Sequence, residues 1–314
     1  PLSGWAADFT TEASVTVNDI YFGLGLTTSE VNLQVNATQI TDIALDATSG
    51  KVNYYTTEAC TAKATLAPGS LTPAPGTYYV KVVPSNASNS GWKAGQVIVK
   101  PMPLKVTVGD ATKQFNNKGT EDPDETLGTI TAISKLKWTS DTDRTLVDDA
   151  LTGDDLTDMA ALMTVTRQSG KAVKSSYTYT AAFTAANSNY TISSTSGKFS
   201  ITKRTLPTTR GTEGDTFSAT ITNNEKTYNG ADQAPTVTIV DNGTGYTLTS
   251  SDYTLKYDEA TSAKDYKAGG YVISFVTKGN YNESTVTLND ATLDKNFFIN
   301  QKALVVYVDD IEMA

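Results

Sequence analysis

The chain has 314 residues and a net charge of −9, and 39 % of its residues are hydrophobic, which is enough for packed cores in two or three domains. It contains no histidine and one cysteine. This composition excludes a histidine-based nucleophile triad, a histidine metal ligand, an intrachain disulfide and a thiolate zinc site. The 52 threonines and 16 tyrosines favour strands, because β-branched and aromatic side chains suit a pleated surface.

The acidic balance argues against a nucleic-acid binder, which needs clustered Lys and Arg. No apolar run approaches the roughly 18 residues of a membrane helix, so the sequence predicts no membrane insertion. Residues 1–9 lack the basic and apolar regions of a secretion signal. Either a signal has been removed before Pro1, or Pro1 follows a removed initiator Met in a protein made without one.

A first phrase, a predicted strand that usually leads to a polar pair, recurs along the chain at 14–20, 105–111, 219–224 and 305–311. The second and third copies stay in step beyond the phrase, because Lys113-Gln114-Phe115-Asn116 matches Lys226-Thr227-Tyr228-Asn229. A recurring phrase of this kind predicts that the same structural unit is built several times.

A second phrase closes each unit with a tyrosine-rich strand, a dipeptide ending in an aromatic residue, a further strand and a leucine. The dipeptides are Gly91-Trp92, Asn189-Tyr190 and Asn280-Tyr281, and the leucines are Leu104, Leu206 and Leu304. Within the strands the period is two, so Tyr271, Ile273 and Phe275 share one face.

These repeats predict three β-domains at 1–102, 103–203 and 204–302, followed by an extra strand at 303–314. Short strands with turn signals between them indicate an all-β fold of tandem Ig-like β-sandwich domains, with β-grasp units as the alternative. The connections at residues 100–103 and 203–207 are too short for flexible linkers, so we expect an elongated, semi-rigid array.

Two local predictions depart from this pattern. Residues 154–163 are predicted to form one short helix, with Asp154 and Asp155 as its cap. Cys60 lies in a strand-like run and is expected to be a buried small hydrophobic residue; an intermolecular thiol is the alternative.

The second unit resembles the MBG-type repeats of bacterial surface proteins. The residues that carry this resemblance are Asp122-Pro123, 151–156, 166–173, Asn189-Tyr190-Thr191-Ile192 and 199–204. The third unit is similar to related tandem repeats through 248–255, 268–271 and 278–281, and the first is a faint relative. Near Lys174 the family pattern usually has a glycine, and this copy departs from it there. The resemblance implies an extended extracellular β-module without enzymatic activity.

The acidic segment 121–160 holds eleven acids against three basic residues. The simplest interpretation is an acidic surface exposed to solvent. The alternatives are a patch for a basic partner or a divalent-cation site. The candidate calcium ligands are Asp141, Asp143, Asp148 and Asp149, although the segment lacks the central Gly and terminal Glu of an EF-hand loop. No other cofactor is predicted.

Other candidate sites are weaker. No local pattern marks a pair of catalytic carboxylates or a Lys–Asn cross-link, so we expect no enzymatic activity. The crowded aromatic residues Trp5, Phe9, Tyr21 and Phe22 are expected to be core, with docking onto a neighbouring subunit as the alternative. Glycan binding through an exposed Trp92 or Trp138 stays open.

Two functions fit these observations. The first is a non-enzymatic structural protein on a virion surface, a capsid decoration or fibre of a phage, whose partners are other structural subunits. The second is a segment of a bacterial cell-surface adhesin or stalk, whose partner is a host-surface protein or glycan. The extra strand is expected to add to a sheet edge, either in the third unit or in another copy of the chain, because an isolated strand leaves its backbone groups unpaired.

Overall fold

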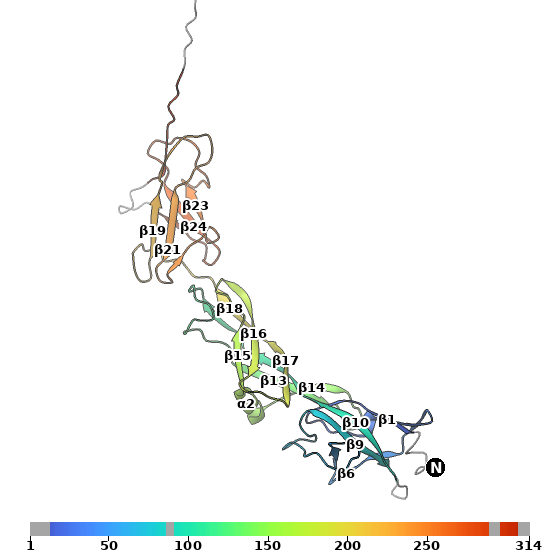
Figure 1. The fold of residues 1–314 in the computed structure, drawn as a ribbon. Coiled ribbons are helices and arrows are strands. Elements are labelled where there is room, and N and C mark those ends of the chain that lie inside the picture. Colours follow the sequence, from blue (N-terminus) through green and yellow to red (C-terminus); the bar gives the residue numbers. More distant parts are fainter. Residues whose placement is uncertain (1–12, 86–90, 289–295, 307–314) are drawn as a thin grey trace, which may run out of the picture. The chain divides into compact units, whose positions relative to one another are not determined.

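The computed structural model is an all-β protein with several separate sheets (Figure 1). It describes residues 13–85, 91–288 and 296–306. In these ranges there is one α-helix, α2 (Gly153–Ala161), and one 3-10 helix, η1 (Thr28–Glu30). The helix predicted at 154–163 is confirmed, but its cap position is Thr152, and the two aspartates lie in the first turn. Neither helix is long and apolar enough to span a membrane.

The chain divides into two compact units. The first comprises 1–109, 128–166 and 179–197, and the second comprises 110–127, 167–178 and 198–314. This division runs through the segment 103–203, so the domain boundaries expected at 102/103 and 203/204 stay predictions.

The first hundred residues form two larger sheets and a small hairpin. The sheet orders are β1-β3-β4 and β2-β10-β9-β5, with β8 also paired to β9, and the hairpin is β6-β7. The strands are β1 (Ala13–Val17), β2 (Ile20–Tyr21), β3 (Val31–Val35), β4 (Thr38–Ile40), β5 (Ile43–Leu45), β6 (Ala47–Thr48), β7 (Lys51–Val52), β8 (Tyr54–Tyr55), β9 (Gly76–Pro84) and β10 (Lys93–Lys100).

The core of this region lies between the sheets, where the alternate residues Val31 and Leu33 of β3 pack near Val82 of β9. Gly95 of β10 lies beneath β1, and a Cβ atom added there would come within 2.7 Å of Val15 and 2.5 Å of Val17. Only glycine allows the two sheets to approach this closely. The arrangement is that of a β-sandwich.

The next hundred residues form two four-stranded sheets, β14-β13-β11-β17 and β12-β18-β16-β15. Their strands are β11 (Met102–Val108), β12 (Ala111–Gln114), β13 (Ile130–Trp138), β14 (Leu146–Ala150), β15 (Met163–Arg167), β16 (Lys174–Phe183), β17 (Tyr190–Ser196) and β18 (Lys198–Thr202).

The remaining strands form three small sheets, β19-β21-β22, β20-β26 and β23-β24-β25. They are β19 (Phe217–Thr222), β20 (Glu225–Thr227), β21 (Thr236–Asp241), β22 (Tyr246–Thr247), β23 (Tyr253–Tyr257), β24 (Ile273–Thr277), β25 (Thr285–Thr287) and β26 (Phe298–Asn300).

The first recurring phrase of the sequence has the same structure at three places. At each, one strand ends, two residues intervene, and a second strand begins: β1 to β2, β11 to β12, and β19 to β20. The earlier strand pairs antiparallel with β3, β13 or β21, and the later strand pairs parallel with β10, β18 or β26. The chain therefore moves from one sheet to another within two residues each time.

Two sequence predictions need correction. Cys60 is 2 % exposed, which confirms a buried thiol, but it lies in a turn with φ +48° and not in a strand. Residues 303–306 form no strand, because no described strand pairs with their backbone. The rest of the predicted extra strand, together with Trp5 and Phe9, lies outside the described residues.

Candidate functional site

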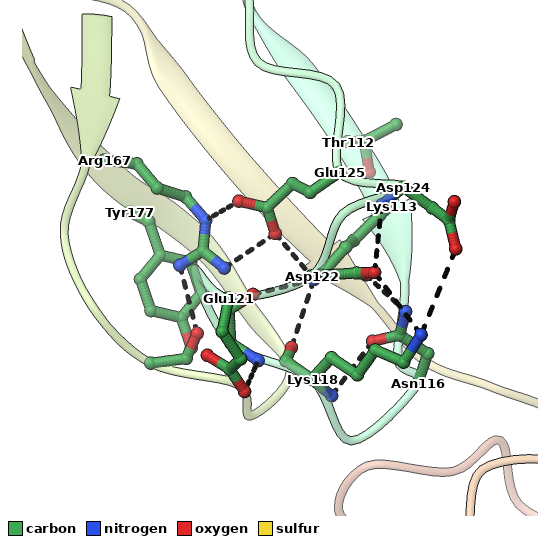
Figure 2. Close-up of polar contacts among 12 residues, drawn as sticks. Thr112, Lys113, Asn116, Lys118, Glu121, Asp122, Asp124, Glu125, Arg167 and Tyr177 are labelled. Carbon is green, nitrogen blue, oxygen red and sulfur yellow. Dashed lines mark hydrogen bonds and ion pairs between the residues drawn. The ribbon is translucent and has the colours of Figure 1, made fainter.

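A buried cluster of charged side chains lies beside β12 in the second unit (Figure 2). Lys113 Nζ on β12 contacts Glu125 Oε2 at 2.6 Å and Asp122 Oδ2 at 3.1 Å. Arg167, at the end of β15, donates to both carboxylate oxygens of Glu125, at 2.6 and 2.7 Å. The side chains of Asp122, Glu125 and Arg167 are at most 5 % exposed.

Each charge in the cluster is balanced and hydrogen-bonded. The Asn116 amide and the Lys113 ammonium hold the pKa of the Asp122 carboxyl well below its usual range, despite burial. Burial raises the pKa of Glu125, but bonds from Arg167 and Lys113 outweigh it, so that this pKa is lowered as well. The pKa of Arg167 is raised by its bond to Glu125. Both carboxylates are therefore ionised at neutral pH and occupied by neighbours.

Further hydrogen bonds and a ring contact join this cluster to the neighbouring loops. Asp122 accepts from the backbone N–H of Asp124, and Arg167 donates to the backbone oxygens of Gln168 and Gly170. The Arg167 guanidinium also lies 4.8 Å from the centre of the Phe199 ring. These contacts fasten the segment after β12 to the end of β15, so the arrangement stabilises loops and leaves no free reactive group.

A first joint, inside the first unit, links residues on either side of residue 102. Arg144 makes a two-pronged ion pair with Glu30, at 2.7 and 2.9 Å, and Glu30 is 5 % exposed. Glu30 also accepts from the backbone N–H of Thr27, which completes a capping box at η1. The Trp138 ring lies under the Arg144 guanidinium, 4.2 Å away, and its Nε1 donates to the carbonyl oxygen of Gly25.

The same joint contains an aromatic contact. Phe22 follows β2 directly, and its ring meets that of Tyr190 edge to face at a centroid distance of 5.5 Å. Backbone bonds fix both sides: Phe22 N–H donates to Lys100 O, and Met102 N–H donates to Asn189 O. Burial raises the pKa of Tyr190.

A second joint, inside the second unit, repeats this design around residue 204. Phe115 follows β12 directly and meets Tyr281 edge to face at 5.7 Å. The backbone bonds recur, from Phe115 N–H to Thr202 O and from Arg204 N–H to Asn280 O. The strand register is also the same, because Met102 pairs with Tyr190 and Arg204 pairs with Tyr281 in parallel.

Ion pairs support the second joint too. Arg204 Nε contacts Asp241 Oδ2 at 2.8 Å, and the hydroxyl of Tyr281 donates to the same oxygen. Asp252 accepts from the backbone and side-chain nitrogens of Asn280. Asp241 and Asp252 are at most 1 % exposed. These buried acids are fully engaged in holding the chain together.

Two of the described cavities of the first unit lie beside Tyr190. One, of 360 Å³, is lined in part by Phe22, Lys137, Asn189 and Tyr190; another, of 260 Å³, shares Lys135 and Tyr190 with it. The buried Oδ1 of Asn189 accepts no hydrogen bond. The larger hollow is lined from both sides of residue 102 and belongs to the first joint, where packing around Tyr190 is incomplete.

The four candidate calcium ligands are not brought together. Asp148 pairs with Lys105 and Asp149 with Lys137, both at 2.7 Å, and consecutive residues of β14 face opposite sides of the sheet. Asp143 accepts from the hydroxyl of Thr145. Nowhere in 13–85, 91–288 or 296–306 do three metal-ligating side chains form a group that could hold an ion. The calcium site stays an untested prediction.

The candidate aromatic sites also separate. Trp138 is engaged by Gly25 and Arg144, so its ring belongs to the first joint. Trp92 is 38 % exposed, with Lys81 Nζ 4.9 Å from the ring centre. Phe22 is 7 % exposed, and it packs against Tyr190 of the following repeat.

Glu30, Arg144 and Asp241 were not among the residues that the sequence marked as candidates. The Thr27-to-Glu30 spacing of a capping box was visible, but the partner Arg144 lies 114 residues away. No local pattern reveals such a pair.

No protein-family model matches this sequence, and no curated protein shows significant similarity to it.

Proposed function

We propose that this chain is a non-enzymatic structural protein of three tandem Ig-like modules, related to MBG-type surface repeats. Its proposed place is the exposed surface of a phage virion, as a capsid decoration or fibre component that contacts other structural subunits. The observation that supports this is the recurrence of one joint design, with the same aromatic contact, backbone bonds and register around residues 102 and 204.

The joint design favours a spacer over a hinge. A flexible connection between modules exposes its backbone and makes few side-chain contacts. Here buried ion pairs, Arg144–Glu30 and Arg204–Asp241, support the two joints. Such pairs resist opening, because separating them leaves an uncompensated buried charge. A chain joined in this way holds its attachment points at a set distance.

The state of the buried acids supports a role without catalysis. Catalytic carboxylates need a pKa matched to proton transfer and a free approach for substrate. Asp122, Glu125, Asp241 and Asp252 are instead buried under hydrogen bonds and ion pairs from their neighbours. These carboxylates therefore stabilise the fold through their hydrogen bonds and ion pairs.

Solution scattering tests the tandem arrangement. A single compact body of this length has a radius of gyration of about 20 Å. Three modules in line, each with its own radius of gyration of about 13 Å, give an overall radius of gyration of about 30 Å. We expect the larger value at low protein concentration, with little change between 50 mM and 500 mM salt. A value near 20 Å would overturn the proposal.

The setting needs a separate test, because the family resemblance also suits a bacterial cell-surface adhesin or stalk. The codons directly upstream of Pro1 distinguish the two. A start codon beside genes for capsid or tail proteins supports the virion component. A secretion signal supports the cell-surface stalk.

A further inference from the structure

Two hollows of the first unit meet at Lys135 and Tyr190. The larger, of 360 Å³, is lined by residues 22–24, the turn 67–70, β13 and the dipeptide Asn189-Tyr190. The smaller, of 260 Å³, is lined by α2 together with residues of β11 and β13. Ligand pockets in proteins span roughly 300–1,000 Å³, so the larger hollow alone has room for a small ligand.

The second joint shows what the first one lacks. There the side-chain oxygen of Asn280 accepts a hydrogen bond from the Val173 N–H, and Tyr281 is fully buried. At the first joint, the buried Oδ1 of Asn189 accepts no hydrogen bond from the described residues, and Tyr190 is half-buried beside the larger hollow. A buried acceptor without a donor costs free energy, so this position suits a ligand that supplies a hydroxyl.

The charge around the hollows comes from a lysine that is left without an acid. Lys135 and Lys137 lie on the same face of β13. Asp149 stands opposite Lys135 in the register of β13 and β14, yet it pairs with Lys137 at 2.7 Å. No acid of the described residues pairs with Lys135. Its ammonium favours an anionic group in the larger hollow, because Asp155 and Asp158 line the smaller one.

The rest of the larger hollow is mostly apolar, through Phe22, Leu24, Met102, Leu136 and Tyr190. A suitable ligand therefore combines an apolar face for the aromatic rings, a hydroxyl for Asn189 and one carboxylate for Lys135. A short acidic saccharide meets all three requirements. A polyanion does not, because the chain carries a net charge of −9.

We propose that the larger hollow binds a short saccharide that carries a carboxylate, as in a sialic or uronic acid. The carboxylate meets the Lys135 ammonium, a hydroxyl donates to Asn189 Oδ1, and a C–H face of the sugar packs on the Tyr190 ring. This binding activity goes beyond the proposed structural role and does not depend on where the chain is displayed.

Titration calorimetry of the full chain tests the proposal with three probes. These are sialyllactose, a disaccharide that contains one glucuronic acid, and the neutral disaccharide lactose. We expect at least one acidic probe to bind with a Kd below about 1 mM, and lactose to bind about tenfold more weakly or less, because a charge-assisted hydrogen bond is lost.

Two variants separate a binding role from a structural one. Lys135→Met keeps the apolar stem and should weaken the acidic probe about tenfold, to the level of lactose. Asn189→Ala should weaken every probe that binds, while the melting temperature of the free chain is unchanged or higher, because no donor loses its partner. Lys51→Met is the matched control, since Lys51 is exposed and lines neither hollow; it should leave binding unchanged.

Several results would overturn the inference. They are no binding of any probe at millimolar concentration, equal affinity for lactose and the acidic probes, and binding that survives both variants or falls equally with Lys51→Met. A lower melting temperature of Asn189→Ala with unchanged binding would also do so, because it assigns Asn189 to the stability of the joint alone. The proposed tandem structure is tested separately, since it stands on a radius of gyration of about 30 Å.

Discussion

At the first joint, the Tyr190 ring meets Phe22 beside a hollow of 360 Å³; at the second, the Tyr281 ring meets Phe115 and also stacks on Tyr246, 6.5 Å away. The side-chain hydroxyl of Tyr281 is bonded to Asp241, and its neighbour Asn280 is bonded to Asp252 and to Val173. Asn189, at the same repeat position, keeps an unpaired Oδ1. The same kind of dipeptide is therefore tightly packed and fully hydrogen-bonded at the second joint, but loosely packed at the first.

This difference shows which part of the joint is essential. The edge-to-face aromatic contact, the two backbone hydrogen bonds and the parallel register are present in both joints, so they define how one repeat follows another. The packing around Tyr190 differs from the packing around Tyr281, because it depends on residues outside the recurring phrases, such as Tyr246.

The largest loss of stability should come from replacing the dipeptide tyrosines of the two joints, Tyr281 and Tyr190. Tyr281→Ala should destabilise the second unit by about 3–5 kcal/mol, because it empties a fully buried site and leaves Asp241 without one donor. Tyr190→Ala should cost about 1–2 kcal/mol, since Tyr190 is only half-buried beside a hollow. Chemical denaturation of the full chain, followed by fluorescence and hydrogen exchange, measures both; equal losses would contradict the comparison.

A medium effect should follow from acidification of the second joint. Burial raises the pKa of Asp252, but bonds from Thr249, Tyr246 and Asn280 outweigh it and lower the pKa below its ordinary value near 4. A carboxyl with a lowered folded pKa stabilises the fold above its unfolded pKa, and this contribution is lost as the pH falls through the folded pKa. The second unit should therefore lose stability from about pH 4 downward.

Asp252→Asn tests this assignment. The variant should be less stable than the parent chain at pH 7 by about 1–3 kcal/mol, because it replaces an ionised acceptor with an amide. Its stability should also fall less steeply below about pH 4, as measured by thermal melts at a series of pH values. An unchanged acid profile would assign the pH dependence to other carboxyls, such as Asp122 and Glu125.

The smallest effect belongs to Asp148, an exposed acidic residue of β14. Asp148→Asn removes an ion pair whose side chains are 55 % and 48 % exposed, so it should change stability by less than about 1 kcal/mol. Adding calcium or a chelator should leave the melting temperature unchanged. A calcium-dependent rise that disappears in Asp148→Asn would instead establish the metal site suggested by Asp141, Asp143, Asp148 and Asp149.

Much of the local structure was accessible from the sequence. The strand at 105–108, the break at Gly109-Asp110 and the helix at 154–163 follow from alternation, turn residues and acidic first-turn residues, which act over a few positions. Cys60 shows the limit of such patterns: its neighbours are typical of a strand, but its backbone adopts φ +48° in a turn packed against the core.

The composition and the recurring phrases alone predicted that this chain is rich in strands and repeats one structural unit, because alternation and turn chemistry are local properties. Tertiary structure decided which acids are buried. The pairs Glu30–Arg144 and Glu125–Arg167 join residues 114 and 42 positions apart, and only the folded chain brings such charges within 3 Å. It also decided that Leu104 and Leu206 are core while Leu304 is surface, since exposure depends on what packs against a side chain.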